Sequence, residues 1–477
     1  MSKTLEKKLS NDIDEIKEFI YAYGNKTNGD YKIVLENMTE PLDDEEYRNA
    51  RAKYIEDTAK EDNELKKLMS HISELCNNES CLNCPINKYC NHFIKSIRLK
   101  NSKVDNFKMV DLFCGAGGLS LGFTQEGFTS VLANDIQECC VDTYSHNHPE
   151  TPMRNIILGD INEAIPKIEE ISNSQKLDIV VGGPPCQGFS MANRQRLIND
   201  PRNKLYKKYV EIVNIIQPQF FVMENVKGML SVANQVVEDF EKIGYEVSYK
   251  VLNAKDYGVP QNRERLIYIG NRIKVDNTLI FKEIEVLSDK IPNYYLQDAL
   301  YGLKVLEPLR IKNATNYVSE KTGARIMPSI KQRNEYINLI NQNRMIDITC
   351  NHKSRYNNDR DIEIYSRLLP GDKSDDPKIA DIMPYKNRNH IFKDKYFKLE
   401  PNKVCKTITA HMKFDCNMYI HPSQPRGLTP REAARVQSYP DDYYFRGAFT
   451  KTYMQVGNSV PPLLGRAIAT VLKKYIK

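Results

Sequence analysis

Residues 177–190 read Leu-Asp-Ile-Val-Val-Gly-Gly-Pro-Pro-Cys-Gln-Gly-Phe-Ser. The apolar, β-branched run at 177–181 predicts a buried strand of a parallel sheet. The glycines and prolines that follow end this strand and place Cys186 on a loop at the carboxyl edge of the sheet, where open α/β sheets carry their chemistry. A cysteine taken alone is more often an ordinary buried residue. Its role therefore depends on what the rest of the chain brings to the same edge.

The bulk composition is that of a globular protein with more than one domain. The chain has 477 residues, of which 41% are hydrophobic and 27% charged, and this length predicts two or three domains. No apolar run approaches the roughly 20 residues that span a bilayer, and the first residues lack a secretory apolar region. We expect a cytoplasmic protein without a membrane partner.

Charge is unevenly distributed along the chain. The net charge is +6, with about −3 in residues 1–100 and about +9 in the remainder, of which about +7 falls in residues 271–425. A basic surplus in one segment is typical of a phosphate-binding surface, although a solvated face gives the same count. The segment is irregular and rich in Asn and Tyr, and Lys, Arg, Asn and Thr are residues that contact phosphates and base edges.

The N-terminal 100 residues are polar, with a helical pattern, and end in a cluster of four cysteines. Such spacing in a cytosolic protein favours a metal site over disulfides, and thiolates suit zinc or an iron–sulfur cluster. The string 81–90 resembles the [4Fe–4S] loop of helix-hairpin-helix DNA glycosylases, but the first spacing is shorter here. We expect a [4Fe–4S] cluster ahead of Zn²⁺, with free thiols as the third reading. The expected ligands are Cys76, Cys81, Cys84 and Cys90.

A cofactor-binding pattern follows at residues 108–161. An apolar strand leads into the glycine turn Cys114-Gly-Ala-Gly-Gly-Leu-Ser120, and two further strands end at Asp135 and Asp160. Glycine backbone at a helix N-terminus lets a ligand approach closely, and a carboxylate one strand away can bind ribose hydroxyls. Ser120 stands where a dinucleotide fingerprint needs a third glycine. The pattern therefore favours a mononucleoside cofactor.

Charged residues are expected beside Cys186 at the same edge of the sheet. Glu224 follows the apolar run 220–223, at the carboxyl end of the next strand. Arg263 and Arg265 stand two residues apart at the entry of a later strand, so both side chains should point to one face. Taken alone, each could be an ordinary surface residue. Next to a nucleophile, the glutamate becomes a candidate acid.

Taken together, these strings resemble the DNA (cytosine-5) methyltransferases. The resemblance covers roughly residues 107–270 and 400–477, with a long variable segment in the expected gap. The motifs that carry it occur in the family's order: Asp111–Gly118, Gly159-Asp160-Ile161, Pro184-Pro185-Cys186-Gln187, Glu224-Asn225-Val226, Gln261-x-Arg263-x-Arg265, Arg426-x-Leu428-Thr429-x-Arg431-Glu432 and Gly457-Asn458-Ser459-Val460-x-Pro462.

This resemblance implies a fold and a domain order. The fold class is α/β, a Rossmann-like S-adenosylmethionine-dependent methyltransferase with a mixed, mostly parallel sheet. The expected parts are a helical N-terminal extension at 1–104, a catalytic and cofactor-binding domain at 105–270, an irregular target-recognition domain at 271–425 and a C-terminal part at 426–477 that returns to the catalytic domain. A Thr429 cap and Pro430 predict a helix at the start of this last part.

The resemblance also implies the cofactor and the residues that hold it. S-adenosylmethionine would be lined by the glycine turn, with Asp135 on the ribose and Asp160 on the adenine amino group. Asp135 stands where the family often has Glu, and Ile136 where it often has an aromatic residue, so nucleoside packing should differ here. The implied cofactor-binding residues are Phe113, Gly115, Gly117, Asp135, Asp160, Ile161, Pro184, Asn458 and Val460.

The implied reaction is methylation of cytosine C5 through a covalent adduct. Cys186 would add to C6 of a flipped cytosine, Glu224 would contact N3, and Arg265, with Arg263 beside it, would hold O2. We expect double-stranded DNA as substrate, a restriction–modification setting with a cognate endonuclease, and a monomer on DNA. The alternatives are a tRNA cytosine-5 methyltransferase and a catalytically silent DNA-binding regulator. Assays on duplex DNA and tRNA would separate them.

Overall fold

The computed structural model describes most of the chain after residue 106. By residue contacts it divides into two compact units. The sheet unit comprises the described residues up to 293 together with 459–476, and the loop-rich unit comprises those from 294 to 458. The described residues are 107–185 and 204–476, except 149, 315–316, 330–331, 343–345, 347 and 385–394.

The sheet unit is built on a seven-stranded sheet of mixed direction. Its strand order is β3-β2-β1-β4-β5-β7-β6. The first five strands in this order pair in parallel, whereas β7 runs antiparallel to both of its neighbours. The mixed, mostly parallel sheet predicted from the sequence is thus confirmed. The strands are β1 (Phe107–Leu112), β2 (Phe128–Asp135), β3 (Ile156–Leu158), β4 (Ile179–Gly182), β5 (Phe220–Asn225), β6 (Glu246–Asn253) and β7 (Glu264–Asn271).

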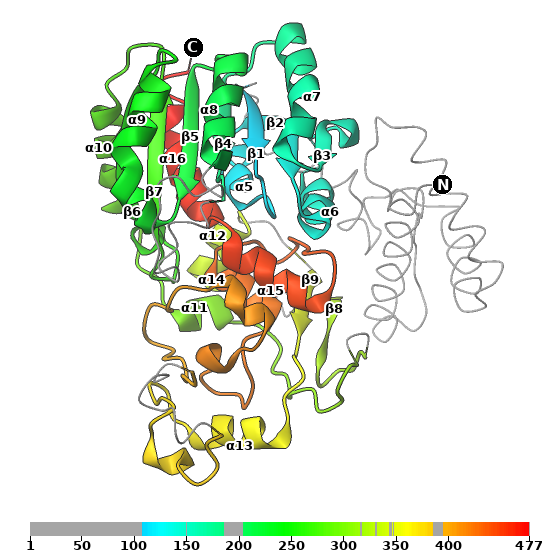
Figure 1. Ribbon diagram of the computed structural model, residues 1–477. Coiled ribbons are helices and arrows are strands. Elements are labelled where there is room, and N and C mark those ends of the chain that lie inside the picture. Colours follow the sequence, from blue (N-terminus) through cyan, green and yellow to red (C-terminus); the bar gives the residue numbers. More distant parts are fainter. Residues whose placement is uncertain are drawn as a thin grey trace, which may run out of the picture. The chain divides into compact units, whose positions relative to one another are not determined.

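Helices cover both faces of this sheet. Figure 1 shows α8 and α9 on the near face and α16 on the far face. The helices are α5 (Gly118–Thr124), α6 (Glu138–Asn147), α7 (Ile161–Ser174), α8 (Lys204–Ile216), α9 (Ala233–Glu241), α10 (Asn277–Ser288) and α16 (Pro462–Leu472), with 3₁₀ turns η4 (Met153–Asn155), η7 (Lys227–Val232) and η8 (Ala254–Tyr257).

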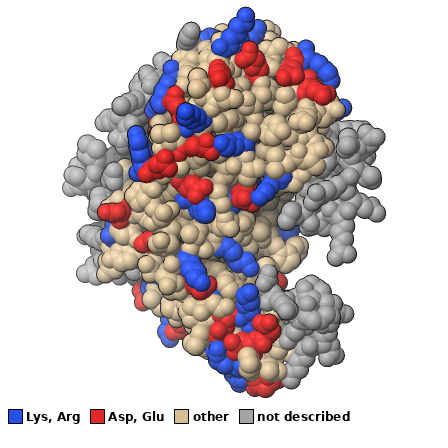
Figure 2. Space-filling model, turned by 90° about the vertical axis from the view of Figure 1, so that its left-hand side faces the viewer, with Lys and Arg blue, Asp and Glu red and all other residues tan. Residues whose placement is uncertain are grey.

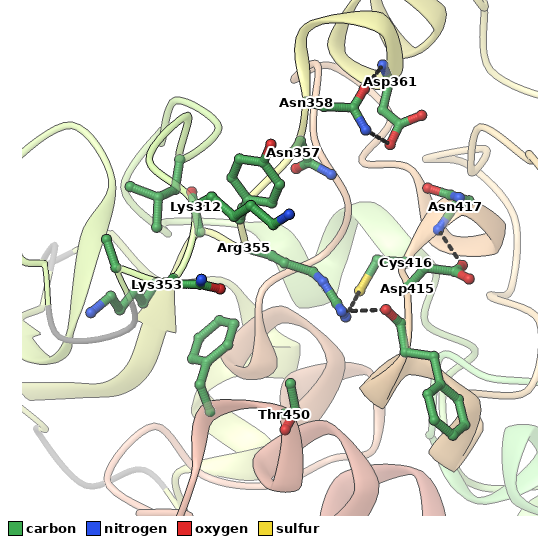
Figure 3. A pocket seen from close by; sticks show the side chains of 17 residues that line it. Lys312, Lys353, Arg355, Asn357, Asn358, Asp361, Asp415, Cys416, Asn417 and Thr450 are labelled. Carbon is green, nitrogen blue, oxygen red and sulfur yellow. Dashed lines mark hydrogen bonds between the residues drawn. The ribbon is translucent and has the colours of Figure 1, made fainter.

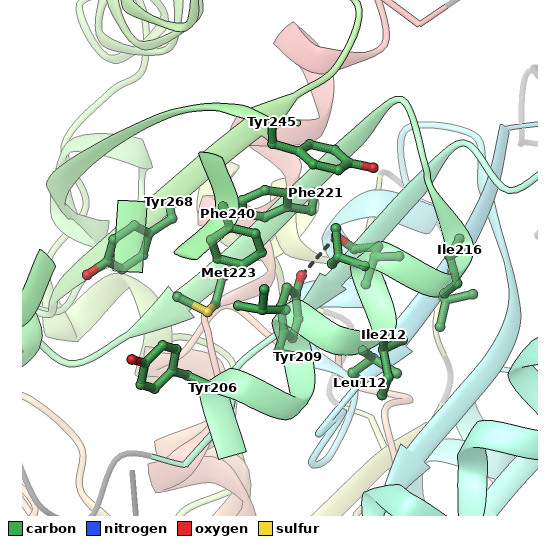
Figure 4. Packing of buried hydrophobic residues seen from close by; sticks show 14 of the residues in the cluster. Leu112, Tyr206, Tyr209, Ile212, Ile216, Phe221, Met223, Phe240, Tyr245 and Tyr268 are labelled. Carbon is green, nitrogen blue, oxygen red and sulfur yellow. Dashed lines mark hydrogen bonds between the residues drawn. The ribbon is translucent and has the colours of Figure 1, made fainter. Parts of the chain in front are cut away.

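The near face carries the main apolar core. Phe221 of β5 stacks on Phe240 of α9 with ring centroids 4.0 Å apart, and Figure 4 shows these rings among side chains from several strands and helices. The buried Tyr209 hydroxyl lies within hydrogen-bond distance of the carbonyl oxygens of Val180 and Val222, at 3.1 and 3.0 Å. A buried polar group needs such partners. The core thus ties α8 to β4 and β5, the two strands that lead into the candidate active site.

The C-terminal helix α16 packs on α5, the first helix of the unit. A Cβ added at Gly122 would lie 2.4 Å from the Pro462 carbonyl oxygen and the Arg466 nitrogen. Only glycine permits this approach of two helix backbones. The last segment of the chain therefore belongs to the sheet unit, next to the turn that begins α5.

The loop-rich unit has a two-stranded antiparallel sheet and short helices. Its elements are β8 (Gly323–Pro328), β9 (Ile348–Lys353), α11 (Leu296–Leu300), α12 (Glu335–Ile340), α13 (Asp359–Arg367), α14 (Pro430–Val436) and α15 (Phe449–Asn458), with 3₁₀ turns η9 (Pro377–Ile379), η11 (Ala410–Lys413) and η12 (Asn417–Tyr419). The helix predicted after Thr429 is α14. The Thr429 side chain accepts from Glu432 N, and the Glu432 carboxylate accepts from Thr429 N.

Charged side chains are buried around α14. Arg426 is fully buried and forms a two-pronged ion pair with Glu432, at 2.7 and 2.6 Å. Arg435 pairs with Asp441 in the same manner. Arg431 instead donates to backbone carbonyls, among them those of Cys350 and Pro440. These bonds join α14 to β9 and to the segment after α14.

The division into units differs in two places from the boundaries expected from the sequence. Residues 271–293, expected with the variable segment, belong to the sheet unit, where α10 buries Ile280 and Phe281. Residues 426–458, expected with the catalytic domain, belong to the loop-rich unit.

In the part of the chain that the structure describes, none of the helices has the length and hydrophobicity needed to span a membrane.

Candidate active site

The loop after β4 begins at a close contact between two strands. A Cβ added at Gly182 would lie 2.3 Å from the Leu112 carbonyl oxygen of β1, so glycine is required there. The next loop residue but one, Pro184, accepts a hydrogen bond from Asn225 Nδ2 at 2.9 Å. This bond holds the loop against the end of β5. Cys186 follows directly and lies outside the described residues.

Glu224 and Arg265 form an ion pair at this edge. Arg265 Nε lies 2.6 Å from Glu224 Oε1, and the side chains are only 13% and 11% exposed. The pair exists because β7 runs antiparallel to β5, with Glu224 opposite Ile267, so the entry of β7 lies where β5 ends. A Cβ added at Gly183 would lie 2.9 Å from Glu224 Oε2. The second carboxylate oxygen therefore faces the loop that leads to Cys186.

Arg263 takes a different partner from Arg265. It is fully buried, and its Nη2 donates to the Ser459 carbonyl oxygen at 2.8 Å. Its backbone N donates to Asn253 Oδ1 at 3.1 Å. The structure thus joins Arg265 to Glu224, and Arg263 to the segment that precedes α16.

The glycine turn after β1 has the backbone shape expected of a ligand cradle. Phe113, Gly115 and Gly117 have positive φ angles of 56°, 54° and 78°. Gly115 N donates to Asp135 Oδ2 at 2.9 Å, and Gln137 N donates to Asp135 Oδ1 at 2.7 Å. Burial raises the pKa of Asp135 above its ordinary value. A Cβ added at Gly115 would meet nothing within 4 Å, so there is open space in front of this turn.

Asp160 and Ile161 begin α7. Asp160 caps the helix, because its Oδ1 accepts from Asn162 N at 2.9 Å. Asp135 pairs with Leu158 across β2 and β3, so Asp135 and Asp160 lie at the same edge of the sheet. The Ile161 side chain is 2% exposed and packs in the apolar core. Any contact of Ile161 with a cofactor would therefore come from its backbone.

Asn458 and Val460 lie on either side of the division between the units. Asn458 is the exposed last residue of α15 in the loop-rich unit. Val460 is buried in the sheet unit, just before α16. Gly457 is tightly packed, since an added Cβ would lie 2.2 Å from the backbone of Thr409 and Ala410.

The structure adds two residues around the glycine turn that the sequence reasoning did not single out as functional. His148 Nε2 lies 3.2 Å from the Gly117 carbonyl oxygen, and its ring stacks on Tyr144 at 4.1 Å. Asp111 of β1 is 1% exposed, and burial raises its pKa to about 7. Asp111 was visible as part of the first motif. His148 lies between motifs, in a string with no recognisable signature.

The remaining sequence predictions concern metal and charge. Among residues 107–185 and 204–476, gaps excepted, no group of three or more His, Cys, Asp or Glu side chains could hold a metal ion. Cys76, Cys81, Cys84 and Cys90 lie outside the described residues, so their metal site stays a prediction. On the face shown in Figure 2, acidic and basic side chains are interspersed without a continuous area of one sign.

Comparisons with known proteins agree with this geometry. A family model described as C-5 cytosine-specific DNA methylase matches residues 107–474. The type II methyltransferase M.DdeI of Desulfomicrobium norvegicum is 34% identical over 77% of this chain and 89% of its own. M1.HphI of Haemophilus parahaemolyticus is 34% identical over 76% and 86%. A crystal structure of a putative DNA modification methyltransferase from an E. coli prophage is similar, with a TM-score of 0.60, 25% identity and coverage of 77% and 99%.

Proposed function

The chain belongs to the C-5 cytosine-specific DNA methylase family and is a DNA (cytosine-5-)-methyltransferase, and we propose that Cys186 attacks a flipped cytosine beside Glu224 and Arg265. The observation that carries this proposal is the Glu224–Arg265 pair, held 2.6 Å apart next to the Gly183–Pro185 loop. Glu224 Oε2 faces the loop that leads to Cys186, and Arg265 holds the other oxygen of the same carboxylate. Cytosine presents N3 and O2 next to each other, which suits such a pair.

The cofactor that the family implies is S-adenosylmethionine, and the described residues fit it. Gly115 faces open space, and the carboxylates of Asp135 and Asp160 at one edge of the sheet support contacts to a ribose and to an adenine amino group. S-adenosylmethionine supplies an electrophilic methyl group when it is bound. Asp135 would accept from the ribose hydroxyls, Asp160 from the adenine, and the turn at Phe113–Gly117, with Pro184, Asn458 and Val460, would contact the remainder.

The residues of this chain would act on cytosine in a fixed order. The Cys186 thiolate would add to C6 while Glu224 hydrogen-bonds to or protonates N3 and Arg265 donates to O2, so that the charge arriving in the ring is stabilised. C5 then accepts the methyl group, a base removes the C5 proton, and the thiolate leaves C6. The cytosine must leave the base stack to reach Cys186. Arg263, through Ser459, would position the segment around Val460.

Other parts of the proposal concern partners. We propose that the loop-rich unit reads the DNA sequence, that the enzyme modifies host DNA in the cytoplasm as the partner of a restriction endonuclease, and that it acts as a monomer. The relatives M.DdeI and M1.HphI are named as type II methyltransferases, which supports the restriction–modification setting.

The four N-terminal cysteines are proposed to bind a [4Fe–4S] cluster or Zn²⁺. Metal and sulfide analysis of the purified full chain would test this, and their absence would refute it.

Methylation mapping tests the main proposal. We expect bisulfite sequencing of DNA from cells that express the chain to show 5-methylcytosine in one short motif, and Cys186→Ser to abolish it. Cys405→Ser, a buried cysteine of the loop-rich unit, should keep the activity. Retained activity in Cys186→Ser would contradict the covalent mechanism. A signal on tRNA and none on duplex DNA would contradict the proposed substrate.

The role of Glu224 needs its own measurement. Glu224→Gln should lower the rate constant of methyl transfer by about 10²–10⁴, the usual contribution of a positioned acid or base, with little change in cofactor affinity. Glu264→Gln is the matched control, because Glu264 forms an exposed pair with Lys227 nearby. A rate in Glu224→Gln equal to that of the control would remove Glu224 from the mechanism.

A further inference from the structure

The loop-rich unit contains a cavity of about 330 Å³ that plays no part in the reaction described above. It lies between the segment after β9, the 309–314 segment, the turn after η11 and the start of α15 (Figure 3). The cavity opens at the surface, since Lys312 is exposed at its edge.

Asn357 lines this cavity with an acceptor that the fold does not use. The side chain is 6% exposed, and its Nδ2 donates to the Tyr365 hydroxyl at 3.3 Å. Tyr365 donates its single proton to Asn417 Oδ1, so it can only accept from Asn357. This chain of bonds fixes the orientation of the Asn357 amide. Oδ1 has no hydrogen-bond partner among the residues that the structure describes.

Ser354 provides a second observation at the same cavity. Its side chain is 1% exposed, and its Oγ has no partner within the described part of the chain. Buried polar groups in proteins are nearly always hydrogen-bonded. Both residues line the cavity, where a ligand with polar atoms would satisfy them.

The rim of the cavity has features of a nucleic-acid contact. Arg355 donates to the backbone carbonyls of Met412, Lys413 and Phe414, which holds the turn after η11 in one shape. On this turn Phe414 is 63% exposed, and Lys413 Nζ lies 4.7 Å from the centre of its ring. An exposed aromatic ring on a rigid turn, with a cation beside it, suits contact with bases and phosphates.

We propose that this cavity reads one base of the DNA, adenine or cytosine, by accepting its exocyclic amino group at Asn357 Oδ1. The inference rests on the proposed DNA substrate and assigns a specificity-determining residue to it. In the major groove, adenine and cytosine present an amino donor, whereas guanine and thymine present acceptors only. Because Asn357 Nδ2 already donates to Tyr365, the amide has no free donor for guanine or thymine. A phosphate is disfavoured because it has no proton to donate to Asn357 Oδ1, the acceptor that the fold leaves without a partner.

The experiment measures sequence preference apart from activity. Duplexes with randomised flanks are methylated by the full-length enzyme and sequenced for 5-methylcytosine. We expect wild type to prefer adenine or cytosine at one position, and Asn357→Ala to lower that preference roughly threefold to tenfold, as for one lost hydrogen bond. Asn334→Ala removes a helix-capping asparagine elsewhere in the unit and should leave the preference unchanged.

Two further arms separate recognition from a structural effect. Tyr365→Phe frees the Asn357 amide to rotate, so guanine and thymine should become tolerated at that position; a variant that only loosens the fold would not change the base preferred. A second duplex carries an analogue without the exocyclic amino group at the position of the recognised adenine or cytosine. Wild type should methylate this duplex more slowly than the natural one, whereas Asn357→Ala should methylate both duplexes at the same rate.

Three outcomes would overturn the inference. These are an unchanged preference in both Asn357→Ala and Tyr365→Phe, an equal loss with the amino-free duplex in wild type and Asn357→Ala, and binding of free adenosine or cytidine at the cavity without any effect of these variants on DNA preference. Absence of methylation by wild type on every duplex would instead be a failure of the proposed function.

Discussion

The two units bury their interiors in different ways. In the sheet unit, the core around Phe221 and Tyr209 is apolar, and the Tyr209 hydroxyl lies within hydrogen-bond distance of two strand carbonyls. In the loop-rich unit, buried charges such as Arg426 and Glu432 hold short elements together. A parallel sheet can satisfy its own backbone, whereas irregular segments need side chains to do so. The comparison predicts different sensitivities for the two units.

The largest effect is expected from breaking the buried ion pair. Glu432→Gln removes the charge opposite Arg426, and unpairing a buried charge costs about 3–5 kcal/mol. Hydrogen exchange followed by mass spectrometry should show this loss in the loop-rich unit. Glu264→Gln, at an exposed pair, should change stability by less than about 1 kcal/mol. Equal losses in the two variants would contradict the comparison.

Acidification should affect the two units in opposite directions. Burial lowers the pKa of His352 and of His421 to about 4, so between pH 6.5 and 4 the unfolded chain binds more protons than the folded one and stability falls as the pH falls. Burial raises the pKa of Asp111 to about 7. Between pH 4 and 7, Asp111 is therefore protonated in the folded chain and ionised in the unfolded chain. Stability rises as the pH falls from 7 to 4, because the folded state binds the additional proton.

Between pH 6.5 and 5, each of these groups should change the free energy of unfolding by about 2 kcal/mol, since one pKa unit corresponds to about 1.4 kcal/mol. Hydrogen exchange at the two pH values, corrected for intrinsic rates, would resolve the units. His352→Gln should reduce the acid sensitivity of the loop-rich unit and leave the sheet unit unaffected. The same sign of change in both units would show that these buried groups do not control their stability.

The smallest effect should be the same in both units. Ile212 of α8 and Ile364 of α13 are both fully buried among apolar residues, and Ile→Val at such sites costs about 0.5–1.5 kcal/mol. We expect Ile212→Val and Ile364→Val to lower stability by similar amounts in denaturant titrations. A much larger loss at either site would show that apolar packing, rather than charge, distinguishes the two units.

Much of the sheet unit could be predicted from the sequence because its signals are local. The β-branched run at 177–181 predicts a buried strand, and the turn Gly115–Gly117 has the positive φ angles that glycine favours. For the loop-rich unit, the sequence indicated only a basic, irregular segment and the helix cap at Thr429. Its core depends on pairs such as Arg435–Asp441, together with the bond between Tyr336 and the Arg435 carbonyl. No periodicity records such contacts between distant segments.

The sequence by itself determined the family, the order of the motifs and which strands end in Asp135, Glu224 and the Pro-Pro-Cys loop. Only the tertiary structure decided how the arginines divide. Because β7 runs antiparallel to β5, Arg265 meets Glu224 and Arg263 meets the Ser459 carbonyl. The unused acceptor of Asn357 was equally invisible in the sequence. It depends on Tyr365 and Asn417, which belong to separate segments of the chain. Only folding brings them together in the series of hydrogen bonds that orients the Asn357 amide.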